Sequence, residues 1–292
     1  MPNIVLDVIQ PGQLQTGGEG GQFDIGRYAK RYLAQGDSWF SIGHIPPWCT
    51  SNLLQQMVLG RAAVAVNCAR PSAKLAHMTD TTSNTLFLNL LRGRLAFQWD
   101  AILLSGGGND LIDAVQLPAT NAPEHRLLRP PIEWGPASDG AARYFCNAGW
   151  ATFSAHLNDV FDIFIAERDR GINLGAPVLC HAYDYLTPRH APAGFGFGPW
   201  LYNAVHDEYA LPPEDWNAFA DLLIDRLFAL LIDIIAKRPT KNLHLVDSRG
   251  AALRALPGTV GENGDWENEI HPSAHGYGLM AARWRPLLDG MA

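Results

Sequence analysis

The alternation of hydrophobic and polar stretches along the chain predicts short buried strands separated by helices. Five short apolar runs are suited to strands buried on both faces of a parallel sheet. They span residues 32–36, 62–67, 101–105, 177–182 and 243–247. Each run is too short for a helix and is bounded by polar, Gly or Pro residues.

Between and after these runs, apolar residues recur at the spacing of a helix face. Ser51 is a suitable N-cap for a helix over 51–59. An apolar stripe from Trp150 to Phe164 predicts a second helix, and a third begins after Pro212-Pro213. Strands that alternate with helices form a parallel sheet covered on both faces. The pattern therefore predicts an α/β fold, a three-layer α/β/α sandwich with a five-stranded parallel sheet.

The domain organisation follows from the same pattern. Residues 1–30 are rich in Gly and Gln and have little periodicity, which indicates an irregular N-terminal arm. Residues 31–292 form one domain with long insertions near 114–142 and 187–209. Ligands of open α/β sheets bind beyond the carboxyl ends of the strands, where we expect both insertions to emerge.

Composition and charge exclude several classes of protein. Hydrophobic residues make up 47% of the chain, enough for a packed core, and the net charge of -7 disfavours nucleic acid and anionic membrane surfaces as partners. The most apolar stretch, 219–236, contains charged residues and reads as an amphipathic helix rather than a membrane span. The start of the chain has no recognisable targeting segment, which fits a cytoplasmic or virion-borne protein. The four cysteines are widely spaced, which disfavours a zinc site or disulfide framework.

Three short motifs carry the candidate chemistry, and the first is Gly36-Asp37-Ser38-Trp39, which follows the 32–36 strand. A serine at a tight strand-to-helix turn presents its hydroxyl away from the sheet, as a nucleophile requires. An Asp-Ser pair after a strand is also a common helix N-cap, so this motif alone leaves both interpretations open.

The second motif, Ser-Gly-Gly-Gly-Asn-Asp at 105–110, follows the 101–105 strand. Its glycines allow the backbone to approach a ligand closely, and the side chain of Asn109 adds an NH₂ donor. These groups suit an anion or oxyanion. A glycine-rich turn capped by Asn109 or Asp110 explains the same residues equally well.

The third motif is Glu-Ile-His-Pro-Ser-Ala-His-Gly at 269–276, near the end of the chain, and it contains His271-Pro272. Pro272 is expected in the first turn of the last helix, which places His271 at the helix N-terminus. The helix dipole there disfavours the imidazolium and keeps the ring able to accept a proton. A histidine in a surface turn is the alternative.

In this order the motifs resemble those of the SGNH hydrolases, also called GDSL esterases and lipases, over about residues 30–290. The resemblance implies a flavodoxin-like fold and a serine esterase that needs no metal or organic cofactor. It implies that Ser38 is the nucleophile and His271 its base. Asn109 and the backbone N–H of Ser38 are implied as donors to the oxyanion.

The chain departs from the family pattern at two positions. Ser72 replaces a glycine whose N–H usually points into the oxyanion hole. We expect the Ser72 N–H to serve as a donor if the backbone there does not require a positive φ.

The second departure is Asn268, at the position of the family's usual acid, three residues before the histidine. An Asn carbonyl can orient the imidazole but adds no charge. Asp265, Glu267 and Asp247 are alternative third residues, and reduced activity is a further outcome.

Substrate-contacting residues are expected in these motifs and in the aromatic insertion: Trp39, Gly108, Phe197 and Trp200. O-acetyl groups on carbohydrate are the first expected substrate, and short acyl esters the second. A weakly active or non-catalytic module that binds a glycan or another ligand is the alternative function. The sequence leaves open the choice between hydrolysis and acyl transfer, and also the oligomeric state.

A metal site formed by His181, Asp184 and His190 is a weaker hypothesis. The ten histidines are scattered through the chain, so chance proximity explains this set better.

Overall fold

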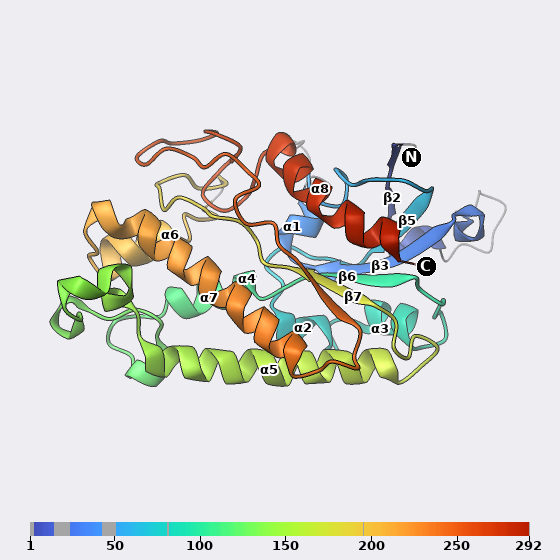
Figure 1. Ribbon diagram of the computed structural model, residues 1–292, viewed down its shortest axis with the longest axis horizontal. Coiled ribbons are helices and arrows are strands. Elements are labelled where there is room, and N and C mark those ends of the chain that lie inside the picture. The colour runs from blue at the N-terminus through green and yellow to red at the C-terminus, as the bar shows by residue number, and fades with distance from the viewer. Residues whose placement is uncertain (1–2, 15–23, 43–50, 81, 195, 292) are drawn as a thin grey trace.

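The computed structural model describes residues 3–14, 24–42, 51–80, 82–194 and 196–291. Its centre is a six-stranded parallel sheet with the order β2-β5-β3-β6-β7-β8 (Figure 1). The strands are β2 (Asp7–Ile9), β3 (Lys30–Gly36), β5 (Ala63–Asn67), β6 (Ala101–Ser105), β7 (Val178–His181) and β8 (Leu243–Val246). A separate antiparallel pair joins β1 (Ile4–Val5) to β4 (Val58–Leu59).

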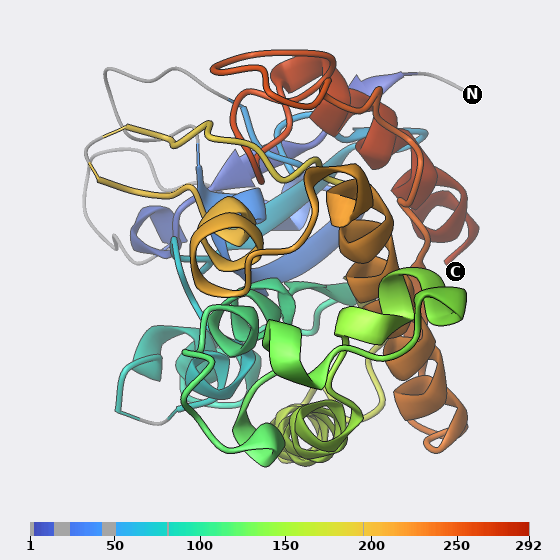
Figure 2. The same ribbon diagram turned by 90° about the vertical axis from the view of Figure 1, so that its left-hand side faces the viewer.

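Helices cover both faces of the sheet. They are α1 (Ser38–Ser41), α2 (Leu75–Met78), α3 (Thr85–Leu91), α4 (Gly108–Val115), α5 (Asn147–Asp169), α6 (Leu201–Asn203), α7 (Trp216–Ala236) and α8 (Ala274–Gly290). Figures 1 and 2 show α8 on one face of the sheet and α5, with α2 and α3, on the other. The predicted three-layer α/β/α sandwich is thus confirmed.

All five predicted strands are present, but the sheet has a sixth. The strand β2 lies within residues 1–30, which were expected to be irregular, and it pairs in parallel with β5. It has three residues and contributes one edge of the sheet, so its apolar pattern is too short to recognise. The expectation of an irregular arm is therefore wrong for this part of it.

The predicted helix over 51–59 is also wrong, since this segment forms turns that end in β4. The side-chain Nδ2 of Asn52 donates to the Ile42 carbonyl at 2.8 Å, and its Oδ1 accepts from Gln55 N at 3.0 Å. These bonds to the backbone replace helical ones. Leu53 and Leu54 are buried, so the apolar spacing reflects packing of a turn against the core.

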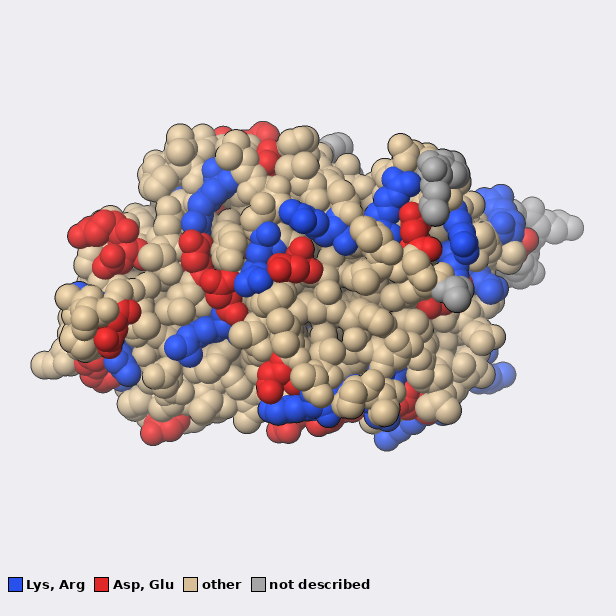
Figure 3. Space-filling view, viewed as in Figure 1, with Lys and Arg blue, Asp and Glu red and all other residues tan. Residues whose placement is uncertain are grey.

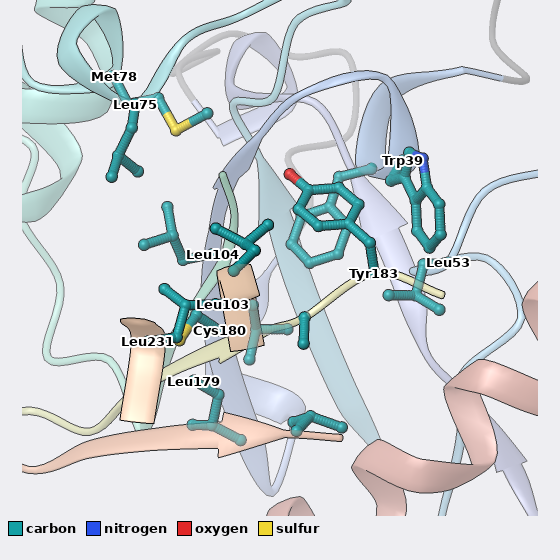
Figure 4. Close-up of a cluster of buried hydrophobic side chains, with 14 of the residues drawn as sticks. Trp39, Leu53, Leu75, Met78, Leu103, Leu104, Leu179, Cys180, Tyr183 and Leu231 are labelled. Atoms are coloured by element: carbon teal, nitrogen blue, oxygen red, sulfur yellow. The ribbon is translucent and has the colours of Figure 1, made fainter. Parts of the chain in front are cut away.

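The hydrophobic core lies on both sides of the central strands. Every residue of β5 and β6 is buried, and Figure 4 shows Leu103, Leu104 and Leu179 of this core beside Leu231 of α7. Pairing of β3 with β6 sets Gly36 opposite Ser105. The first two motifs therefore begin side by side, at the carboxyl ends of adjacent strands.

The remaining segments are short helices, turns and loops. The 114–142 insertion contains the 3₁₀ turns Pro123–His125 and Pro131–Glu133 and the start of Ala137–Tyr144. Three cysteines are free thiols, Cys68, Cys146 and Cys180, while Cys49 lies outside the described residues. No helix in the described ranges is long and apolar enough to cross a bilayer. Figure 3 shows acidic and basic side chains interspersed on the face that it displays.

Candidate active site

Ser38 is the first residue of α1, directly after β3. The preceding residue, Asp37, caps this turn, and its side chain accepts from Trp39 N at 3.0 Å. The Ser38 hydroxyl lies 2.8 Å from Nε2 of His271, although the two residues are 233 positions apart in sequence. The fold therefore joins the first and third motifs in one hydrogen bond.

Asn268 fixes the tautomer of His271. Its Oδ1 accepts from the backbone N–H of Ile270 at 3.1 Å and of His271 at 3.0 Å, so this atom is the carbonyl oxygen. The same oxygen lies 3.0 Å from His271 Nδ1, which must carry the proton and donate it. Nε2 is then the free acceptor that faces Ser38, as general-base catalysis requires.

Burial, rather than a helix dipole, keeps His271 neutral. The ring is buried, and its removal from water lowers the pKa of His271 to about 4. The helix α8 begins only at Ala274, with Ser273 as N-cap and Pro272 before the cap. The expected placement of Pro272 in the first helical turn is therefore wrong.

None of the three alternative carboxylates hydrogen-bonds to His271, although the backbone N–H of Glu267 donates to the His271 carbonyl at 2.9 Å. Asp265 is 2.8 Å from His275 Nδ1, and Asp247 accepts from Arg249 Nε at 2.9 Å. The Glu267 side chain makes no hydrogen bond to any residue in the described ranges. Asn268 is thus the third residue of the hydrogen-bonded series Ser38–His271–Asn268.

The turn that holds Ser38 rests on a buried hydrogen-bond network of Asp37, Ser105, His181 and Tyr183. Asp37 accepts from Ser105 Oγ at 2.7 Å and from the Tyr183 hydroxyl at 2.5 Å. His181 Nδ1 accepts from Tyr183 N at 3.2 Å, so its Nε2 carries a proton and donates to Ser105 Oγ at 2.9 Å. Burial raises the pKa of Asp37 to about 6, while these donors oppose the rise.

The weaker metal hypothesis is not supported, because two of its three residues have other partners. His181 belongs to the network below Ser38, and Asp184 accepts from the backbone N–H of Tyr185 at 2.7 Å and of Ala252 at 2.9 Å. Over the described ranges no group of three or more His, Cys, Asp or Glu side chains is arranged to hold a metal ion.

Gly108 allows a close approach that a side chain would prevent. A Cβ at this position would lie 2.5 Å from the Tyr183 ring, and the Gly108 N–H donates to the Tyr183 hydroxyl at 3.0 Å. Figure 4 shows Tyr183 beside Trp39, with the two rings 4.9 Å apart. The second motif therefore packs directly on the network that holds Ser38.

Of the candidate oxyanion donors, Asn109 lies at the cavity beside Ser38 and Ser72 does not. The Asn109 side chain lines the cavity beside Ser38, and its Nδ2 donates to the Ala73 carbonyl at 3.1 Å. An amide NH₂ has two hydrogens, so one remains for a ligand. Ser72 has a φ of 59°, the left-handed conformation that favours glycine. It is also exposed and does not line the cavity, so nothing supports the predicted role of its N–H.

The cavity that opens at Ser38 is mainly aliphatic. Its empty space, including the open mouth, is about 610 Å³. Apart from Ser38 and its neighbours, the walls are formed mostly by apolar side chains of α4 and α7 and of the segments around them: Leu111, Ile112, Val115, Leu186, Leu201, Ala220, Leu223, Ile224, Leu227 and Ile270. Pockets of this kind bind apolar groups and use few polar contacts for orientation.

Two of the four predicted substrate contacts, Trp39 and Gly108, line this cavity. Phe197 does not, because the turn in which its N–H donates to the Gly194 carbonyl leaves its side chain 63% exposed. Trp200 lies outside the cavity lining and instead packs edge-to-face on the His271 ring, with centroids 5.3 Å apart.

Sequence reasoning missed several residues of this site. Tyr183 gave no signal, although its φ of 61° marks an unusual backbone position two residues after the β7 strand. The cavity residues of α7 were assigned to the core, because a cavity wall and a core face have the same apolar spacing. Leu201 was not singled out, and Glu269 was included in the third motif without a role.

Comparisons with known proteins support the fold. The chain is similar to an extracellular lipase from Streptomyces rimosus, with TM-score 0.50 and 16% identity over 90% of this chain and 100% of that one. It is also similar to the lipase Lip_vut3 from a goat rumen metagenome, with TM-score 0.51 and 12% identity over 90% of this chain and 98% of that one. Models of protein families give no match, and neither do curated protein sequences. The fold implied by the resemblance to SGNH hydrolases is thus confirmed.

Proposed function

We propose that this protein is a serine ester hydrolase that acts on carboxylic esters with an aliphatic acyl group. The observation that carries the proposal is the hydrogen-bonded series Ser38–His271–Asn268, with the serine facing an apolar cavity. The two structurally similar proteins are lipases by name, which agrees with this chemistry.

The reaction proceeds through an acyl-enzyme. Ser38 Oγ attacks the ester carbonyl carbon while His271 Nε2 takes its proton, and Asn268 Oδ1 keeps Nδ1–H in place. The second N–H of Asn109 and the backbone N–H of Ser38 donate to the oxyanion. His271 then protonates the leaving alcohol and afterwards activates the water that releases the acid.

The cavity favours an aliphatic acyl chain over an O-acetyl group on a sugar, which was the first expectation. Sugar hydroxyls need hydrogen-bond partners, and the cavity walls beyond Ser38 and Asn109 are mostly aliphatic. Each buried methylene contributes about 0.8 kcal/mol. We therefore expect kcat/KM to rise about fourfold per added CH₂ until the cavity is filled.

The test is hydrolysis of p-nitrophenyl esters from acetate to decanoate by the wild type and by Ser38→Ala. Acetylated xylo-oligosaccharides serve as the competing substrate, and circular dichroism confirms folding. We expect Ser38→Ala to lose about 10⁶ in kcat, the scale known for removal of a serine nucleophile. A preference for acetylated sugar would overturn the acyl-chain assignment. A folded wild type that is inactive on every ester would overturn the enzyme assignment and favour a binding module.

Added alcohol distinguishes hydrolysis from acyl transfer. Hydrolysis predicts free acid as the main product in 1 M methanol, a concentration chosen well below that of water. Methyl ester as the main product would instead identify an acyltransferase.

A further inference from the structure

We propose that Glu269 is a positioning residue of this site. Its buried carboxylate holds Trp200 against the ring of His271 and Leu201 in the wall of the cavity. The inference rests on the proposed esterase function and adds to it a residue that links the base to the acyl pocket.

Glu269 is bound almost entirely by peptide N–H groups. Its Oε2 accepts from the backbone N–H of Trp200 and from that of Leu201, the latter at 3.0 Å. Its Oε1 accepts from Tyr202 N at 2.6 Å and more weakly from Arg189 N at 3.4 Å. Four donors on one carboxylate satisfy both oxygens, and the side chain is only 1% exposed.

The residues that Glu269 holds contact both the His271 ring and the cavity at Ser38. Trp200 stands edge-on to the His271 ring at 5.3 Å, with an angle of 86° between the planes. The next residue, Leu201, is buried and lines the cavity at Ser38. Since Glu269 is two positions before His271, one short segment fixes the base and, through the carboxylate, the loop that covers it.

No cation side chain neutralises Glu269 by direct contact. The Arg189 guanidinium donates to the carbonyl of Asn268 at 2.8 Å and to that of Gly261, and it forms no ion pair with Glu269 within the described ranges. The carboxylate therefore serves to collect backbone donors. A buried charge used only for stability is more often paired with a cation.

If Glu269 positions the site through its charge, protonation of Glu269 should change kcat/KM with pH, which a purely structural residue would not do. Along the segments that it joins, the nearest titratable groups are Glu267 and His271 on its own segment, Arg189 and His190 on the second, and Tyr202 on the third. Burial raises the pKa of Glu269 to about 7, while the four N–H donors oppose the rise. A protonated carboxyl carries an O–H toward N–H donors and can no longer accept from all four.

The experiment compares Glu269→Gln and Glu269→Ala with the wild type and with Glu267→Gln. Glu267 is the matched control, because it is a half-buried neighbour in the same segment whose side chain bonds to no described residue. Acetate and octanoate p-nitrophenyl esters are assayed from pH 4.5 to 9, with thermal unfolding measured for each variant. Reaction of Ser38 with a fluorophosphonate, checked against Ser38→Ala, reports the reactivity of the nucleophile independently of turnover.

At pH 8.5 we expect Glu269→Ala to lose about 10²-fold in kcat/KM, the cost of misplacing a reacting group by about 1 Å. The loss is larger for octanoate, because Leu201 no longer completes the cavity wall. Glu269→Gln keeps one carbonyl acceptor and should lose about 5-fold. In the wild type, kcat/KM should fall by a similar factor as the pH drops through about 7. This fall should be missing from Glu269→Gln and present in Glu267→Gln.

Two results would overturn the inference. One is an active, Ser38-dependent wild type in which folded Glu269→Gln and Glu269→Ala both behave like Glu267→Gln. The other is a loss of kcat/KM in the Glu269 variants that is equal for the acetate and octanoate esters, with the fall in kcat/KM near pH 7 still present in Glu269→Gln. If the wild type itself lacks esterase activity and Ser38 does not react, the proposed function fails first and this inference fails with it.

Discussion

The charge of the third residue is the feature of this site that a single substitution tests best. Asn268→Asp changes one NH₂ group to oxygen and introduces a carboxylate beside His271 Nδ1. In a serine-protease triad where an amide replaces the acid and produces the wrong tautomer, the rate falls by about 10⁴. If the same defect were present here, Asn268→Asp would recover most of that factor.

The geometry predicts a much smaller gain. Two backbone N–H groups already hold Asn268 Oδ1 toward His271, so the tautomer is correct without a charge. The substitution then adds only the stabilisation of an imidazolium by a neighbouring anion, which shifts a pKa by about 1–3 units. Because only part of this appears in the transition state, we expect about a 10-fold rise in kcat/KM, or about 1.4 kcal/mol.

The assay is kcat/KM for p-nitrophenyl butyrate across pH 3.5 to 9. The acid limb should move upward from its midpoint near pH 4, since the carboxylate makes His271 easier to protonate. Asn263→Asp is the control, because this residue lies in the same loop and its Oδ1 accepts from Leu256 N at 2.8 Å, away from His271. A gain of about 10³ or more would refute the assigned tautomer.

Three further predictions follow from individual residues. The final loss of kcat/KM at low pH should have a midpoint near 4, because burial lowers the pKa of His271 to about 4 and the ring stays neutral above it; a midpoint near 6.5, measured where the protein is still folded, would contradict this. Ser72→Gly should raise the free energy of unfolding by about 0.5 kcal/mol, measured by thermal or urea denaturation. The strain of a serine in the left-handed conformation is removed, and this gain outweighs the added conformational freedom of the unfolded chain. A loss of stability would contradict this. Gly108→Ala should cost about 1–3 kcal/mol of stability and lower kcat, because the new Cβ meets the Tyr183 ring. Gly290→Ala, where nothing lies within 4 Å, is the control: it should leave kcat unchanged and should not lower stability, since a helix favours alanine over glycine.

Much of the architecture was predictable from local pattern. Fully buried parallel strands appear as short apolar runs, and all five such runs became strands of the sheet. The motif at Ser38 and the one at Asn109 each follow a strand, so their placement at the carboxyl edge follows from the parallel arrangement. These features depend on neighbours in sequence, which is why periodicity and turn chemistry reveal them.

Local pattern failed where a contact from elsewhere decided the conformation. Residues 51–59 have helical spacing, but Asn52 bonds to the Ile42 carbonyl and the segment ends by pairing with β1. The short edge strand β2 acquires its structure from pairing with β5 rather than from its own pattern.

The sequence by itself therefore determined the α/β class, the order of the motifs and the candidates Ser38, His271 and Asn109. Tertiary structure alone decided that the side chain of Asn268, rather than that of Asp265, Glu267 or Asp247, contacts the histidine ring. It also decided that the apolar faces of α4 and α7 form a cavity wall, and that Glu269 binds the loop at Trp200. The physical reason is that a side chain's type sets what it can bind, while only the packing of distant segments sets which partner lies within 3 Å.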